Sequence, residues 1–352
     1  VASGREWRGG QRQVWLLARA LGRLGVEQVV VTGAGTELSR RLRAAAVPVR
    51  GTGWRIGLDP RVLWPIFREV RRGPAILHAH DAHALTLAGM VAQLTRTPLV
   101  VTRRVDFPLR RRGYWGRADR IVAISNAVAD VLERDGIPRH LITVVHSGIA
   151  LDSVTGVTRL GVRRQLGLRP NAPVVANVAA LVPHKDHATL IAAAQQLLPR
   201  QPDLHWVVAG EGELRAELER RVTESGLRGR VHLVGHMDDP LRLIADADVL
   251  VMSSREEGLG TSVLDAMALG IPVASTAAGG LPEMLGAGAG LMVPPGEPAA
   301  LADAVDRVLQ DGDLRARLVE RAKLEVQRFS DRKMAEALRS VYRSCVHSLD
   351  GS

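Results

Sequence analysis

The chain has 352 residues, which is enough for two domains that each bury a core. Hydrophobic residues make up 46% and charged residues 24%, as in ordinary globular proteins. No apolar run approaches the roughly 18 residues that a membrane-spanning helix needs, and the start does not resemble a signal peptide. The single cysteine, Cys345, excludes internal disulfides and cysteine-rich metal sites and predicts a cytoplasmic location.

The net charge of +10 is unevenly distributed. Residues 1–150 contain 24 Arg and 11 acidic residues, whereas the rest of the chain has a net charge of −3. Basic runs such as Arg103 with Arg104, or residues 110–112, are either solvated surface or face an anionic partner. With 3% aromatic residues and no nucleic-acid motif, base stacking is disfavoured. We therefore expect no nucleic-acid partner, and rank an anionic membrane surface or acidic glycan higher.

Short apolar runs alternate with helical patterns along the chain. The first helical patterns cover residues 11–25, 125–135 and 188–198, and two helices without strands follow at 314–329 and 332–349. The runs are apolar throughout, which is typical of parallel strands covered on both faces. The sequence thus predicts a doubly wound α/β architecture, with strands at residues 28–32, 75–79, 98–102, 120–124, 142–146, 174–179, 204–209, 231–234, 249–253 and 272–275.

The pattern breaks between residues 148 and 173, where Gly, Pro and Arg replace apolar residues. This segment predicts a linker between two Rossmann-like halves. We expect domains at 1–155 and 156–330, with a C-terminal helix at 331–352 that crosses back toward the first domain. Only Val1, Ala2 and Ser3 precede the first glycine-bearing loop, so we expect the first strand to be only partly present.

The densest motif covers residues 253–267. A strand ends, a loop containing Gly258 and Gly260 follows, and a helix begins near Thr261. Such a layout directs free backbone N–H groups and the positive end of a helix at one point, which favours a phosphate. Glu257 lies in this loop and Asp265 about one turn into the helix, where they could meet a sugar and a ribose. The alternative is a helix-capping Glu and a solvent-facing Asp.

Lys185 follows the first strand of the second half, in a chain that has only two other lysines. Ligands of doubly wound sheets bind outside the carboxyl ends of the strands, so Lys185 and the Glu257 loop are expected to open on one crevice. An ammonium there would neutralise a diphosphate as a point charge. The alternative is an ordinary surface lysine.

Three further loops follow predicted strands. Gly210 and the turn Gly235–His236–Met237 are predicted to line the nucleotide side of the crevice, or to be simple turns. The dinucleotide motif is disfavoured at residues 33–38, because its third glycine is missing. His78, His80 and His83 lie close together in sequence with Asp81, which makes a metal site conceivable.

In these motifs the chain resembles the GT4 family of glycosyltransferases over almost its whole length. The segment from Glu257 to Asp265 is similar to the E-x7-E motif of the family, and Lys185 matches its diphosphate lysine. Further similarity lies in Gly9–Gly10 at the start of the first helix, and in residues 77–81 and 145–149. The resemblance implies a GT-B fold of two Rossmann-like domains facing a central cleft, with C-terminal helices packing back across both. It also implies retaining transfer of a sugar, with neither metal nor cofactor.

The resemblance also implies roles for individual residues. Glu257, Lys185 and His80 are the expected catalytic residues, with His80 touching the transferred sugar or the acceptor. Donor contacts are expected from the loop and helix that follow Glu257 and from the turns after two neighbouring strands. These residues are Gly258, Gly260, Thr261, Asp265, Gly210, Gly235, His236 and Met237. The first domain would bind a glycan or lipid-linked acceptor near Gly9, Gly10, Arg103 and Arg104. Envelope polysaccharide or lipopolysaccharide synthesis is the implied setting, in the cytoplasm or at the inner face of the plasma membrane.

Two positions depart from the family pattern. Asp265 replaces the second Glu of the motif, and Ala180 stands where the family usually has an Arg. Both changes remove part of the expected donor contact, so two alternatives stay open. One is an epimerase or hydrolase of nucleotide sugars on the same fold, and the other is a non-catalytic nucleotide-sugar-binding subunit.

Overall fold

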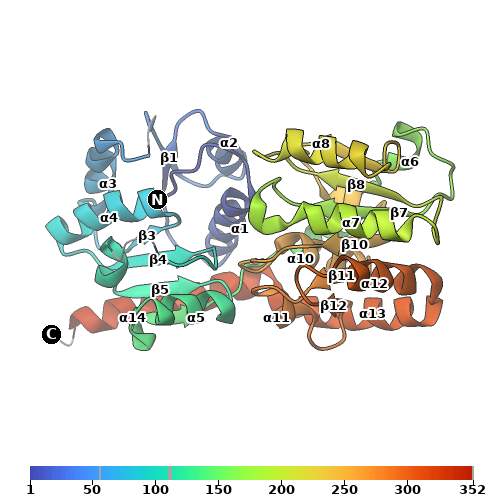
Figure 1. The fold of residues 1–352 in the computed structure, drawn as a ribbon. Helices are drawn as coiled ribbons and strands as arrows, with labels where there is room; N and C mark the ends of the chain where they lie inside the picture. Colours follow the sequence, from blue (N-terminus) through green and yellow to red (C-terminus); the bar gives the residue numbers. More distant parts are fainter. Residues whose placement is uncertain (55–56, 110–112, 351–352) are drawn as a thin grey trace. The chain divides into compact units, whose positions relative to one another are not determined.

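The computed structural model describes residues 1–54, 57–109 and 113–350, with side chains up to 346. The chain forms two compact units (Figure 1). Unit 1 contains Val1–Ala150 and the chain from Phe329 onward, and unit 2 contains Leu151–Arg328. The boundary lies a few residues before the expected one at 155, and the returning segment begins at 329 rather than 331. The basic run at 110–112 lies outside the described residues.

Unit 2 is built around a six-stranded, fully parallel sheet in the order β12-β11-β10-β7-β8-β9. The strand order reverses between β7 and β10, as in a Rossmann fold. The strands are β7 (Val174–Val178), β8 (His205–Ala209), β9 (Val231–Gly235), β10 (Val249–Met252), β11 (Val273–Thr276) and β12 (Leu291–Val293). The helices are α6 (Val162–Gln165), α7 (His187–Leu197), α8 (Arg215–Glu224), α9 (Leu241–Ile244), α10 (Thr261–Leu269), α11 (Leu281–Leu285), α12 (Pro298–Gln310) and α13 (Gly312–Glu325).

The core of unit 2 lies where α7 and α12 cover one face of this sheet. Alternate residues of a strand point to opposite faces, so Val249 and Val251 contribute to this core while Leu250 and Met252 point to the other face. Ala193 and Ala302 are fully buried there, and their small side chains allow the two helices to approach closely. Both faces of the sheet are thus covered, which explains the uninterrupted apolar runs.

The predicted linker at 148–173 is for the most part folded onto unit 2, so this prediction was wrong in extent. Val162 donates its backbone N–H to Asp246 at 2.6 Å, and the Arg163 guanidinium pairs with Asp248 at 2.6 Å. The N–H of Leu160 donates to the carbonyl of Arg242. Gly and Pro indicate turns, but the acidic partners lie more than 80 positions away and are invisible to a local pattern.

Unit 1 contains a parallel pair, β1 (Val30–Gly33) with β2 (Val49–Thr52), and a parallel four-stranded sheet in the order β3-β4-β5-β6. The N-terminal residues bridge the two, because the Ala2 N–H donates to Val31 and the Val1 carbonyl accepts from the His80 N–H. The strands of the second sheet are β3 (Leu77–Ala79), β4 (Leu99–Arg103), β5 (Arg120–Ala123) and β6 (Ile142–Val144). The helices are α1 (Gly9–Arg23), α2 (Glu37–Ala44), α3 (Leu63–Val70), α4 (Ala82–Thr95), α5 (Asn126–Arg134) and α14 (Asp331–Asp350).

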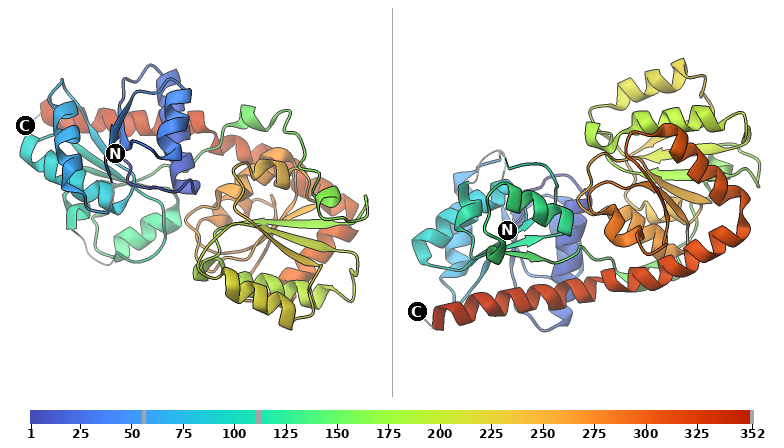
Figure 2. Two further views of the ribbon diagram at one scale, coloured as in Figure 1. Left: turned by 90° about the horizontal axis from the view of Figure 1, so that it is seen from above. Right: turned by 60° about the horizontal axis from the view of Figure 1, so that its bottom comes forward.

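Helix α14 packs against α1 in unit 1, and Figure 2 shows it running along this unit. Leu17 and Leu21 of α1 share a core with Leu338, Val341 and Cys345 of α14. An ion pair of 2.5 Å between Arg23 and Asp331 fixes the start of α14. Burial raises the pKa of the Cys345 thiol. In the part of the chain that is described, no helix is long and apolar enough to cross a membrane.

The segment just before α14 lies very close to the backbone of Gly148 and Ile149. Ile149 donates its N–H to Phe329 and accepts from the N–H of Asp331, and a Cβ on Gly148 would lie 2.6 Å from the Ser330 carbonyl oxygen. We expect Gly148→Ala to destabilise unit 1 by about 1–3 kcal/mol, because backbone cannot yield as a side chain can. Thermal unfolding measures this. Gly35→Ala, where nothing lies within 4 Å, is the control, and an equal effect of both would contradict the prediction.

Candidate functional site

The strand reversal in unit 2 brings two predicted site loops together. β7 and β10 are neighbours, with Val175 opposite Val249 and Ala176 opposite Leu250. Lys185 follows the carboxyl end of β7, and Glu257 follows that of β10. At this reversal the chain leaves the two strands toward opposite faces, so the loops between them frame an opening.

Lys185 and Glu257 form an ion pair through Nζ and Oε2. Both side chains are largely shielded from solvent, at 15% and 10% exposure. The Ser254 hydroxyl donates to the same carboxylate oxygen at 3.3 Å, and the backbone carbonyl of Glu257 accepts from the Gly280 N–H at 2.9 Å. Lys185 is therefore held in place by its partner, and the alternative of a free surface lysine is wrong.

The start of α10 supplies the third part of this site. The helix begins at Thr261, and Gly260 before it has φ +88°, a conformation that favours glycine. A Cβ at Gly260 would also lie 2.8 Å from Leu281 Cδ2. The N-cap residue Gly260 has no side chain that could cap the helix, and no acidic residue lies in its first turn. Its N–H groups and positive end thus lie beside Glu257, in an arrangement that suits an anion.

One of the two alternatives for the acidic pair is contradicted. Asp265 is 1% exposed, so it is not a solvent-facing residue of α10. Glu257 is 8% exposed and pairs with Lys185, and the N-cap position of α10 is occupied by Gly260. Contact of Asp265 with a ribose stays a prediction.

Glycines at the next two strand ends allow their loops to approach closely. The Gly210 N–H donates to the Gly235 carbonyl at 2.8 Å. A Cβ at Gly210, which has φ +154°, would lie 1.8 Å from the Ala179 carbonyl oxygen. At Gly212 a Cβ would lie 2.2 Å from the Leu181 carbonyl oxygen. These glycines are required by packing, which is a sufficient reason for them without a ligand.

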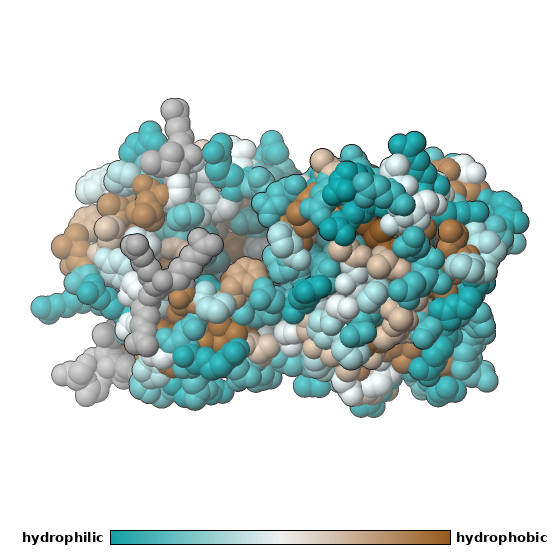
Figure 3. Space-filling model, in the orientation of Figure 1, coloured by the Kyte–Doolittle hydropathy of each residue, from teal (hydrophilic) through white to brown (hydrophobic). Residues whose placement is uncertain are grey.

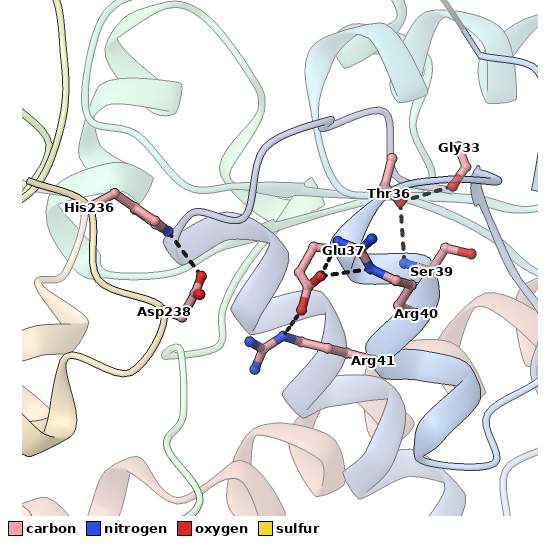
Figure 4. Close-up of polar contacts among 8 residues, drawn as sticks. All are labelled: Gly33, Thr36, Glu37, Ser39, Arg40, Arg41, His236 and Asp238. Atoms are coloured by element: carbon pink, nitrogen blue, oxygen red, sulfur yellow. Dashed lines mark hydrogen bonds and ion pairs between the residues drawn. The ribbon is translucent and has the colours of Figure 1, made fainter.

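The turn after β9 carries the two other predicted base contacts. His236 is exposed, with Nε2 3.4 Å from Asp238 (Figure 4), and Met237 is half-buried. The Gly235 carbonyl already accepts a hydrogen bond from the Gly210 N–H. Contact of this turn and of Gly210 with a nucleotide stays a prediction.

Sequence reasoning missed a second ion pair beside the site. Arg255 Nε donates to Asp186 Oδ2 at 2.7 Å, and its backbone N–H donates to His184 at 2.8 Å. Although burial acts to raise it, hydrogen bonds from Thr189 and Arg255 hold the pKa of Asp186 below its usual range. The signal was available, because Asp186 three residues before Thr189 is a typical helix N-cap. This pair ties the loops after β7 and β10 to each other.

A buried histidine, His187, lies two residues after Lys185 and contacts Asn177 of β7. His187 is 1% exposed, and its Nε2 lies 3.2 Å from Asn177 Oδ1. Burial, with the nearby Lys185 charge, lowers the pKa of His187 to about 4. The imidazole is therefore neutral at neutral pH, and Nε2–H donates to the Asn177 oxygen.

We expect this histidine to make unit 2 less stable in acid. Its pKa is lowered on folding from 6.5 to about 4, so the unfolded chain gains the proton first and stability falls as the pH drops through that window. The loss contributed between pH 7 and pH 5 is about 1–2 kcal/mol. Unfolding midpoints at both pH values should differ less for His187→Gln than for wild type. His140→Gln, at an exposed position, is the control, and unchanged pH dependence in His187→Gln would contradict the assignment.

In unit 1, polar residues gather at the carboxyl ends of the adjacent strands β3 and β4. The ring of His80 lies 4.1 Å from that of His78, and an Arg104 nitrogen lies 3.2 Å from His80 Nδ1. His78 contacts Tyr342 of α14 at 2.6 Å and Thr102 at 2.7 Å. Burial lowers the pKa of both histidines well below the usual value, so both are neutral at pH 7.

Arg104 also lies against the start of α1. Its Cδ is 3.8 Å from the position of a Cβ on Gly10, and α1 begins at Gly9 without a side-chain cap. Burial lowers the pKa of Arg104 to about 10. Its Nε is buried without a hydrogen-bond partner among the described residues. The structure thus brings His80 and Arg104 together beside the start of α1, while contact of these residues with an acceptor stays a prediction.

Arg103 behaves differently from its neighbour. Its guanidinium donates to the carbonyls of Val105 at 3.1 Å and Phe107 at 2.5 Å, and lies over the Trp115 ring. These contacts order the loop after β4 and account for the residue. The expected acceptor contact of Arg103 stays a prediction.

The three histidines near β3 do not converge on one point. His78 uses both ring nitrogens for protein contacts, and the His83 ring lies against Gly57. Over residues 1–54, 57–109 and 113–350, no three His, Cys, Asp or Glu side chains are grouped as a metal site requires. Metal-independent chemistry stays a prediction.

The turn at residues 33–35 is also not built for a dinucleotide. Thr36 caps α2 with its own hydroxyl, which accepts from the Ser39 N–H at 3.2 Å (Figure 4). Glu37 in the first turn of α2 pairs with Arg40 and Arg41. A capped helix start with a carboxylate beside it disfavours a phosphate.

Known proteins match this chain over both units. The family model described as Glycosyltransferase Family 4 matches residues 7–153, and the one described as Glycosyl transferases group 1 matches residues 160–325. The lipopolysaccharide core biosynthesis glycosyltransferase LpsE of Rhizobium meliloti is 32% identical over 89% of this chain and 89% of its own length. The chain belongs to glycosyltransferase family 4. It is an enzyme that transfers a sugar.

A second relative and a solved structure support the same family and fold for this family 4 glycosyltransferase. The 2-deoxystreptamine glucosyltransferase of Streptomyces kanamyceticus is 30% identical over 86% of this chain and 89% of its own length. The crystal structure of Anabaena HepE with UDP-glucose has a TM-score of 0.84 at 22% identity, over 97% of this chain and 99% of that one. The expected fold, with two Rossmann-like parallel-sheet units of the GT-B type, is thereby confirmed.

Proposed function

We propose that this glycosyltransferase takes a nucleoside-diphosphate sugar as its donor and binds it on unit 2. The observation that carries the proposal is the Lys185–Glu257 pair beside the start of α10, whose N-cap residue is Gly260. A diphosphate would occupy the anion site formed by the α10 N–H groups and the Lys185 ammonium. HepE, whose fold this chain shares, has been crystallised with UDP-glucose.

Each group at this site has a task during transfer. As the bond between sugar and diphosphate breaks, negative charge grows on the leaving phosphate, and Lys185 with the amides near Gly260 and Thr261 stabilises it. Glu257 would accept hydrogen bonds from donor-sugar hydroxyls and orient the sugar. The acceptor hydroxyl would attack from the leaving-group face and pass its proton to a phosphate oxygen, which retains the anomeric configuration as the family implies.

Lys185 supplies a larger share of the positive charge at the diphosphate than the family pattern implies. Ala180 stands at the position of a second family cation, and the nearby Arg255 is engaged by Asp186 at 2.7 Å. The Lys185 ammonium and the positive end of α10 lie beside Glu257. Loss of the Lys185 charge would therefore leave the helix end as the chief partner of the diphosphate.

Unit 1 would bind the acceptor at Gly9, Gly10, His80 and Arg104. Arg104 is charged, and its Nε has no hydrogen-bond partner in the described part of the chain, which fits an acceptor with an anionic group. The LpsE relative acts in lipopolysaccharide core synthesis. We propose a glycan or lipid-linked acceptor of the bacterial envelope, modified in the cytoplasm or at the inner face of the plasma membrane.

Donor binding is tested by thermal stability with UDP, GDP and ADP. One of them, at about 100 times its Kd, should stabilise wild type by about 2.7 kcal/mol. Lys185→Ala should lose this shift, because the diphosphate loses its cation. Lys323→Ala, at an exposed lysine of α13, should keep it. A shift that survives in Lys185→Ala would contradict the donor site.

Transfer is tested by product analysis with a nucleotide sugar, with and without envelope glycan acceptors. Glu257→Ala should lower kcat about 100- to 1000-fold, the usual cost of one group that stabilises the transition state. The adjacent exposed Glu256→Ala is the matched control and should retain activity. Consumption of donor without acceptor would instead favour an epimerase or hydrolase. Donor binding with no turnover would favour a binding subunit.

A further inference from the structure

Unit 1 exposes large apolar side chains on and around α3 and α4. Leu58 is 51% exposed, Trp64 67%, Met90 46% and Leu94 75%. Figure 3 shows apolar side chains gathered over these two helices. The ring of Trp64 stacks on that of Phe67. These five residues are called the α3–α4 face below.

The face follows from the helical period of both segments. Met90 and Leu94 are one turn apart on α4, while Leu87 and Val91 on the same helix are buried. On α3, Ile66 is fully buried and turns Trp64 outward. Each helix therefore has an inward apolar stripe that forms the core and a second apolar set that the core does not use. An exposed apolar patch of this kind marks an interaction surface.

Uncompensated positive charge surrounds the face. Exposed arginines lie at 61, 68, 71, 72 and 96. The acidic residues between 58 and 96 are engaged: Asp59 pairs with Arg61, Glu69 pairs with Arg50 and Arg72, and Asp81 caps α4. Arg68, Arg71 and Arg96 have no ion-pair partner among the residues described.

We propose that the α3–α4 face docks onto an anionic membrane surface. Trp64 and Leu94 would enter the boundary between headgroups and acyl chains, and the arginines would bind anionic headgroups. A second copy is disfavoured as the occupant. A symmetric dimer through this face would bring Arg68, Arg71 and Arg96 of both copies together, and like charges repel. The inference deepens the proposed function and rests on it for the lipid-linked acceptor.

Co-sedimentation of the full chain with vesicles tests the proposal. Wild type should bind phosphatidylcholine vesicles that contain phosphatidylglycerol more tightly than pure phosphatidylcholine. Binding should weaken at about 1 M salt, where the Debye length is about 3 Å. Replacing Trp64 and Leu94 together by Ser should lower the partition coefficient about tenfold. Arg68→Gln with Arg71→Gln should lower it about fivefold per arginine on anionic vesicles only.

Two controls distinguish docking through this face from a general effect of surface leucines and from self-association. Leu324→Ser removes another exposed leucine, at 60% exposure on α13, and should leave vesicle binding unchanged. Sedimentation equilibrium of wild type and the Ser double variant detects a dimer. No binding of wild type to anionic vesicles at low salt would overturn the proposal. Equal vesicle binding by wild type and the Ser double variant would also overturn it. So would a wild-type dimer that the Ser double variant loses while vesicle binding is unchanged.

The nucleotide-induced thermal shift is measured on the same variants. It should be unchanged in all of them, because Lys185 belongs to unit 2, whereas the substitutions lie in unit 1 or on the exposed side of α13. A normal nucleotide shift without vesicle binding would refute the docking face alone. Vesicle binding without any nucleotide shift would refute the donor site alone.

Discussion

The proposed donor site of this glycosyltransferase depends on the pairing of β7 with β10. In a parallel sheet whose strand order reverses, the connections from the two central strands leave toward opposite faces, and the opening between them is a consequence of topology. Unit 2 places Lys185 after one of these strands and Glu257 after the other. The ion pair thus joins residues that are 72 positions apart in the sequence. Unit 1 repeats the arrangement, since His80 follows β3 beside the bridging residues Val1 and Ala2.

The charges at the site are better explained as positioning than as stability. A shielded ion pair loses hydration that its mutual attraction only partly replaces, so a fold gains little from it. The effect of the pair is instead to hold the Lys185 ammonium in place beside the start of α10. A flexible lysine would lose side-chain entropy when a ligand orders it, whereas Lys185 is already ordered. Asp186 has a similar effect on Arg255, which it holds at the edge of the loop. The site is therefore arranged in advance for a charged ligand.

Every predicted strand overlaps an observed one, because buried parallel strands are marked by uninterrupted apolar residues. The strands that the sequence did not reveal, β2 and β12, lie at sheet edges and are short. Edge strands bury less, and β2 contains Arg50 and Gly51. Local patterns also located the loops of Lys185, Glu257 and His80, since each follows a strand.

What the sequence left open required contacts over long distances. Nothing local distinguishes Arg103 from Arg104, yet one orders its own loop and the other reaches His80. The partner of His78, Tyr342, lies 264 positions away on α14. Likewise, the burial of Asp265 depends on how α10 packs in unit 2, which its own segment does not encode.

Because Cys345 is buried, its reactivity toward a thiol reagent measures the local opening of the C-terminal helix α14. Cys345 is the only thiol in the chain, it is 3% exposed, and its core cluster contains residues of α1, α14 and the strands β4 and β5. A thiol reagent can reach it only when α14 detaches from the rest of unit 1, at least in part. The rate of a single chemical modification therefore measures how often that helix opens. No label or engineered residue is needed, because every other position in the chain is silent to the reagent.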